Sequence, residues 1–126
     1  MSQVPHAVAA DRQTPTIGTA WSTEEGATRA HHLFTEHIGG SPDGVWAAPG
    51  RVNIIGEHTD YNNGLCLPIA LPHRTYVAAR RRDDDRVILV SQLDDSVLTW
   101  EGTLEEIAPG SVAGWKAYTG GVVWAL

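Results

Sequence analysis

The amino-acid sequence predicts an α+β fold, because a helical pattern near the start is followed by short β-prone segments and then by a second helical pattern. At 126 residues, folding can bury roughly two-thirds of the surface of the extended chain. Hydrophobic residues make up 42% and charged residues 19% of the chain, as in ordinary globular proteins. We therefore expect one domain with an apolar core, preceded by a disordered leader over residues 1–20.

The first helix is predicted after residue 21. Ser22 and Glu25 have the spacing of a capping box, in which each side chain binds the backbone N–H of the other residue. Apolar residues then recur at helical intervals, at Ala27, Ala30, Phe34 and Ile38. Glycines at 39 and 40 end this pattern.

The middle of the chain is β-prone. Residues 45–48 and 51–55 predict two short strands, separated by Pro49 and Gly50. Residues 75–79 and 87–90 predict a hairpin whose tip is the charged run 80–85. A further strand is expected over residues 97–100.

A closing helix is predicted from apolar residues at helical intervals, namely Val112, Trp115, Tyr118, Val122 and Leu126. The chain stops inside this pattern without a cap, so we expect it to be part of a longer domain. Four tryptophans, at 46, 100, 115 and 124, are expected to fill the core. Cys66 is expected to be a buried structural thiol.

Charge and composition narrow the function. The net charge of −6 leaves no broad basic surface, which argues against nucleic acid as a partner. No apolar run approaches the 18 residues of a membrane span, so no membrane association is expected. A single cysteine allows no intrachain disulfide, which favours the cytoplasm.

The segment 48–68 concentrates the chemistry. Arg51, Glu57, His58 and Asp60 lie among the three glycines at 50, 56 and 64. Glu, His and Asp are possible metal ligands, but their spacing matches no zinc motif. A small ligand rich in hydroxyls suits the set better, because carboxylates accept hydrogen bonds and imidazole can donate or accept them. Arg51 would then bind an anion.

Residues 50–64, GRVNIIGEHTDYNNG, closely resemble the galactokinase signature of the GHMP small-molecule kinases, the family that also includes homoserine and mevalonate kinases. The resemblance extends from about Trp21 to the last residue. It implies the N-terminal part of a two-lobed kinase, with a mixed sheet flanked by helices and a fold like the second domain of ribosomal protein S5. Domain 21–126 would then carry the galactose-binding signature at 48–68.

The resemblance also implies roles for single residues. Asp60 would accept hydrogen bonds from ring hydroxyls of D-galactose, while Glu57 and His58 would hold the hydroxyl on carbon 6. Thr59 and Tyr61 complete the substrate-binding set, and Tyr61 and Asn62 are expected to shape the turn. Arg51 would lie beside the anomeric hydroxyl and stabilise the transferred phosphoryl group.

The implied reaction is the transfer of a phosphoryl group from ATP to galactose, with Mg²⁺ and in a monomeric complete enzyme. The family's phosphate-binding loop and catalytic aspartate are expected beyond Leu126, so no cofactor-binding residue and no metal ligand is assigned within the chain. We expect residues 1–126 to be inactive alone. Two alternatives stay open: a kinase of a related sugar such as N-acetylgalactosamine, and a galactose sensor without catalytic activity.

Overall fold

A computed structural model describes residues 18–93 and 96–126, without the side chains of Asp60 and Leu93. It is a small α+β structure, as predicted. The elements in chain order are α1 (Thr23–His37), β1 (Gly44–Ile55), a short 3-10 helix η1 (Asp60–Asn62), β2 (Leu67–Ala79), β3 (Arg86–Leu93), β4 (Ser96–Thr103) and α2 (Lys116–Ala125). Of the predicted leader, residues 1–17 lie outside the described part.

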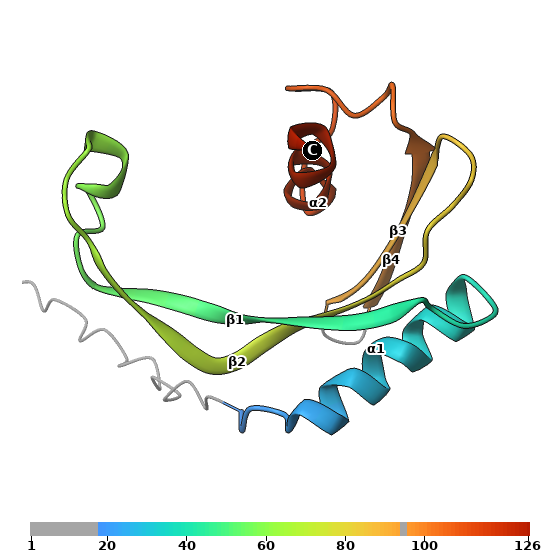
Figure 1. Ribbon diagram of the computed structural model, residues 1–126, viewed down its shortest axis with the longest axis horizontal. Helices are drawn as coiled ribbons and strands as arrows, with labels where there is room; N and C mark the ends of the chain where they lie inside the picture. The colour runs from blue at the N-terminus through green and yellow to red at the C-terminus, as the bar shows by residue number, and fades with distance from the viewer. Residues whose placement is uncertain (1–17, 94–95) are drawn as a thin grey trace, which may run out of the picture.

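The described strands form two separate antiparallel pairs, β1 with β2 and β3 with β4 (Figure 1). The predicted hairpin between residues 75–79 and 87–90 is therefore wrong, and the expected mixed sheet is not formed by these strands. Each strand pairs with its neighbour across a different connection: residues 56–66 join β1 to β2, and residues 94–95 separate β3 from β4. Antiparallel neighbours need only such direct connections, whereas parallel strands need a crossover.

The charged run after β2 links the two pairs instead of forming a hairpin tip. Arg80 donates to the carbonyl oxygen of Gly39 at 2.9 Å, and the Arg81 N–H donates to Asp43 Oδ2 at 2.8 Å. These bonds tie the run to the turn between α1 and β1. The guanidinium of Arg82 holds the carboxylate of Asp84 and lowers its pKa, an effect that the Arg86 N–H reinforces.

Strand β1 is continuous where two short strands were predicted. Its ladder with β2 is irregular between Pro49 and Arg51, and again between Asn53 and Ile55. Pro49 in β1 and Pro72 in β2 lack an N–H and cannot donate to the ladder. The prolines therefore interrupt the pairing without ending the strand.

Helix α1 begins as predicted. The Ser22 hydroxyl accepts from the Glu25 N–H at 3.1 Å, and the Glu25 carboxylate accepts from the Ser22 N–H at 2.8 Å. The helix packs on the β1–β2 pair through Gly26, which is buried against the ring of Tyr76. A methyl group on Gly26 would lie 2.2 Å from that ring, so only glycine permits this approach.

The expected core is small. Phe34 and Ile107 are the buried large apolar side chains of the described residues, at 9% and 5% exposure. Phe34 lies in α1, with the guanidinium of Arg80 5.2 Å from its ring centre. Ile107 lies in the segment between β4 and α2.

Helix α2 starts at Lys116, later than the predicted apolar pattern, and buries Gly120 beside Ile107 and Val112. The predicted stripe is therefore not its contact face, because Tyr118 and Val122 face away from this contact and are exposed.

One apolar face of the β1–β2 pair is left uncovered by the other described elements. Trp46 lies opposite Val77, and Val52 lies opposite Ile69. Trp46 and Val77 are 58% and 52% exposed because neighbouring Tyr76, on the alternate face, is the residue that meets α1. In Figure 1, α1 and α2 lie on opposite sides of this curved ribbon.

The predictions of burial are thus wrong for three of the five residues and met in part for the other two. Trp46 and Trp124 are exposed, while Trp100 and Trp115 are half-buried. Cys66 is also exposed, since it lies in the loop before β2 rather than inside a covered strand. None of the described helices combines the length and apolar character needed to cross a membrane.

Candidate functional site

The predicted ligand-binding residues gather in the loop 56–66, at the end of the β1–β2 pair that is away from α1 (Figure 1). Both strands run into this loop, so its ends are held together by the ladder at Ile55 and Leu67. Its described side chains are exposed, which leaves them open to a ligand.

The loop is closed by its own hydrogen bonds. The Thr59 hydroxyl lies 3.1 Å from the carbonyl oxygen of Gly56 and 2.8 Å from that of Leu65. The backbone carbonyl of Thr59 accepts from the N–H groups of Asn62 and Gly64, at 3.0 and 2.7 Å. Asn62 also donates its side-chain amide to the His58 carbonyl at 2.8 Å, so the prediction that it shapes the turn is confirmed.

Positive φ angles allow the loop to turn at both ends. Gly56 has φ +107°, and its missing side chain leaves room for Cys66, whose Cα would lie 2.6 Å from a methyl group there. Asn63 has φ 57°, in the left-handed region that asparagine tolerates better than most residues. Gly56 and Asn63 therefore serve the backbone conformation of the loop.

His58 and Tyr61 are brought together by η1. The Tyr61 hydroxyl lies 2.7 Å from His58 Nδ1, and the two rings meet edge to face with centroids 6.1 Å apart. A partner on Nδ1 orients the ring and leaves Nε2 for another contact. The arrangement can thus present one defined imidazole nitrogen to a ligand.

The other predicted residues are arranged differently. Glu57 is exposed, and its carboxylate has no hydrogen-bond or ion-pair partner among the described residues. The backbone of Asp60 begins η1, but its side chain lies outside the described part. Arg51 lies on β1, where Nη1 donates to Asn53 Oδ1 at 3.1 Å, and it has no described contact with the loop.

Asn53 is a partner of Arg51 that was not predicted from the sequence. It is two residues from Arg51 on the same strand, so the two side chains share a face and the amide can orient the guanidinium. The alternation of strand residues could have indicated this pair once β1 was taken as continuous.

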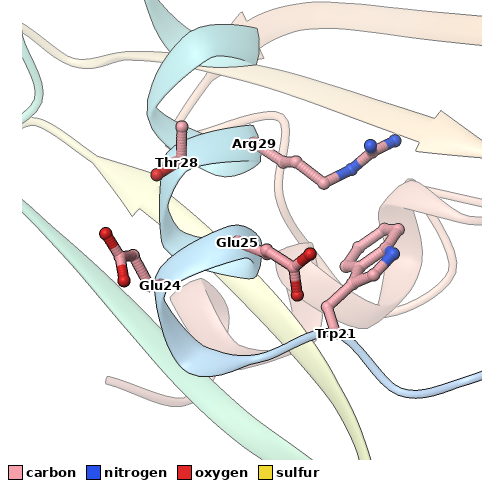
Figure 2. Close-up of a pocket in the computed structure, with 5 residues that line it drawn as sticks. All are labelled: Trp21, Glu24, Glu25, Thr28 and Arg29. Carbon is pink, nitrogen blue, oxygen red and sulfur yellow. The ribbon is translucent and has the colours of Figure 1, made fainter.

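A second surface feature is a shallow hollow of about 380 Å³ at the start of α1, lined by Trp21, Glu24, Glu25, Thr28 and Arg29. Figure 2 shows Trp21, Glu25 and Arg29 on one side of the helix, with Glu24 and Thr28 on the other. Two of the polar groups there are already used, since Arg29 lies 4.4 Å from the centre of the Trp21 ring and Glu25 caps the helix. We therefore do not assign a ligand to this hollow.

We assign no nucleotide or metal site among the described residues. Gly120 and Gly121 lie inside α2, so they form no loop whose N–H groups could surround a phosphate. The described part of the chain contains no cluster of three or more His, Cys, Asp or Glu side chains. The loop offers a carboxylate and an oriented imidazole, which are groups that can form hydrogen bonds with the hydroxyls of a small ligand.

Comparison with known proteins agrees with this class of site. Residues 32–81 match a family model described as the galactokinase galactose-binding signature, which includes all of β1, the loop and β2. The chain is 50% identical over 93 residues to a galactokinase of Streptomyces coelicolor, covering 74% of this chain and 24% of that protein. It is 45% identical over 84 residues to a galactokinase of Mycobacterium tuberculosis (64% and 22%) and 42% identical over 98 residues to one of Pasteurella multocida (75% and 24%).

The loop and the two strands that carry it thus lie within the segment that matches this galactose-binding model. More particularly, residues 32–81 match the galactokinase galactose-binding signature, and the chain is similar in sequence to galactokinases of several bacteria. It spans about a quarter of the length of the curated relatives that it matches.

Proposed function

We propose that this chain supplies the galactose-binding part of a galactokinase, which transfers a phosphoryl group from ATP to the anomeric hydroxyl of D-galactose. The product is galactose 1-phosphate, and the hydroxyl proton passes to a base outside this chain. The proposal is carried by the match of residues 32–81 to the galactose-binding signature. The loop supports the proposal because its own hydrogen bonds fix its shape while its polar side chains are exposed.

Within this proposal, Glu57 and His58 hold the hydroxyl on carbon 6, and Asp60 accepts hydrogen bonds from ring hydroxyls. The His58 ring is suited to this because Tyr61 already occupies Nδ1. Arg51, held by Asn53, provides a fixed positive charge near the anomeric oxygen, where negative charge develops during transfer.

ATP and Mg²⁺ are the cofactors of the proposed complete enzyme, and their ligands are proposed to lie in sequence outside these 126 residues. We propose a monomeric, cytoplasmic enzyme with the two-lobed GHMP architecture, of which residues 21–126 are an N-terminal part. Alone, these residues are proposed to be inactive. The single cysteine supports the reducing compartment.

The test is galactose-dependent ATP consumption by the protein expressed from its complete reading frame. Glu57→Gln keeps the size of the side chain and removes its charge, so we expect kcat/KM for galactose to fall on the order of 10- to 100-fold, as for hydrogen bonds to charged groups. Glu105→Gln is the matched control, because Glu105 is exposed and lies outside the loop. Equal kcat/KM values for the two variants would refute the role of Glu57, and an inactive parent protein would refute the activity.

A further inference from the structure

Thr59 is placed differently from the other polar residues of the loop. Glu57 is exposed without a described partner, and the described partner of the His58 ring is Tyr61. The Thr59 hydroxyl instead lies within hydrogen-bond distance of two backbone carbonyls, those of Gly56 and Leu65. A hydroxyl has one proton to donate, and both of these neighbours are acceptors. The proton is therefore already used inside the loop.

These two carbonyls belong to opposite ends of the loop. Gly56 follows β1 and Leu65 precedes β2, so one side chain spans the distance between the two strand ends. The backbone of Thr59 adds to this closure, because its N–H donates to Gly56 at 3.1 Å and its carbonyl accepts from Asn62 and Gly64. Thr59 thus takes part in several of the hydrogen bonds that give the loop its shape.

Gly64 packs closely against Thr59. A methyl group on Gly64 would lie 2.5 Å from Thr59 Cβ and 3.0 Å from the Thr59 carbonyl oxygen. Such distances require a displacement of the backbone or of Thr59, so the close approach depends on glycine at this position.

We propose that Thr59 is a positioning residue for the sugar rather than a sugar ligand: its hydroxyl holds the loop closed and thereby presents Glu57 and His58. This inference rests on the proposed function and changes the substrate-binding role first expected for Thr59. Glu57 and His58 directly precede Thr59 in the chain, so a shift of its backbone moves both. Such a shift would weaken sugar binding, because side chains held in a fixed position bind a ligand better than mobile ones.

The variants are made in the protein expressed from its complete reading frame. Thr59→Val keeps the branched shape and removes the hydroxyl, and we expect KM for galactose to rise about 5- to 10-fold, the loss of one net hydrogen bond, with kcat within about twofold. Thr59→Ser retains the hydroxyl, so KM should stay within about twofold of the parent value. Thr75→Val is the control, since Thr75 is an exposed threonine in β2 without a described side-chain partner.

Amide hydrogen exchange in the absence of sugar provides a readout that a direct sugar contact would not change. In Thr59→Val we expect faster exchange at Asn62 and Gly64, whose N–H groups donate to the Thr59 carbonyl. Gly64→Ala opens the same contact from the opposite side and should raise KM in the same way, which keeps the test valid if Thr59→Val fails to fold.

The outcomes separate the two claims. A parent protein that does not phosphorylate galactose refutes the proposed function, and the positioning role falls with it. An active parent with an unchanged KM in Thr59→Val refutes only the positioning role. Raised KM with unchanged exchange at Asn62 and Gly64 also refutes it, because Thr59 would then contact the sugar itself.

Discussion

At the scale of single residues, two of the side chains proposed to act on the ligand are each held by a neighbouring side chain. Arg51 is oriented by Asn53, and the ring of His58 is oriented by Tyr61. Each pair joins a charged or titratable group to a neutral partner two or three residues away. The neutral partner restricts the rotation of the functional group, so less entropy is lost when a ligand binds.

Tyr61→Phe tests the second pair. The variant keeps the edge-to-face ring contact and loses the hydroxyl that lies 2.7 Å from His58 Nδ1. We expect KM for galactose to rise about 3- to 10-fold, consistent with the loss of one hydrogen bond. The ¹⁵N chemical shifts of the His58 ring should change toward a mixture of the two neutral tautomers. Unchanged ring shifts would show that Tyr61 does not set the tautomer.

At the scale of elements, the capping box gives α1 a pH-dependent start. The pKa of the Glu25 carboxyl is lowered, first by the hydrogen bond from the Ser22 N–H, then by the Ser22 hydroxyl and by the charge of Arg29. A lowered pKa in the folded state means that the charged carboxylate stabilises the fold above the pKa of the unfolded chain. This contribution is lost as the pH falls through the lowered pKa.

We therefore expect Glu25→Gln to flatten the acid limb of the stability curve. The parent chain should lose stability as the pH falls below about 4.3, the ordinary glutamate value, and the variant should lose less over the same interval. Urea unfolding midpoints measured from pH 6 to pH 2.5 check this. Glu24→Gln is the control, since Glu24 lies in the same helical turn and takes no part in the capping box. Parallel curves for parent and Glu25→Gln would contradict the prediction.

The extent to which the elements could be predicted follows from how local their causes are. The capping box and the glycines that follow α1 lie within a few residues of the helix ends, and both ends were predicted correctly. The pairing of β2 was predicted wrongly because strand partners are chosen between distant residues, and Thr75 to Ala79 could have paired forward or backward. The glycine at 26 gave no sequence signal, since its cause is the Tyr76 ring fifty residues later.

The site shows the same division. The motif predicted which residues would bind a ligand. The hydrogen bond from the Thr59 hydroxyl to the carbonyl of Leu65, by contrast, follows from no spacing rule.

At the scale of the whole molecule, apolar surface is exposed where a core was expected. The pairs Trp46–Val77 and Val52–Ile69 form an uncovered face on β1 and β2, and Trp124 of α2 is 60% exposed. Contiguous apolar surface of this kind favours contact with other protein surface.

The 126-residue chain alone should therefore self-associate. We expect its weight-average mass in sedimentation to rise with concentration, and we expect it to increase the fluorescence of an apolar dye. The double variant Val52→Thr and Ile69→Thr should weaken both effects, because it places hydroxyls on the uncovered face. A single monomeric species at all concentrations, without dye binding, would contradict this prediction.

The irregularity at Pro49 also limits how the length of the chain can vary. Between the pairs Pro49–Arg74 and Arg51–Ala70, β1 has one residue and β2 has three. The excess is even, and side chains alternate between faces with a period of two, so the alternation stays in phase across the gap. A deletion of two residues from this stretch of β2 would preserve that phase. A deletion of one residue would place Arg51 and its partner Ala70 on opposite faces of the pair. Changes of length here are therefore expected in steps of two.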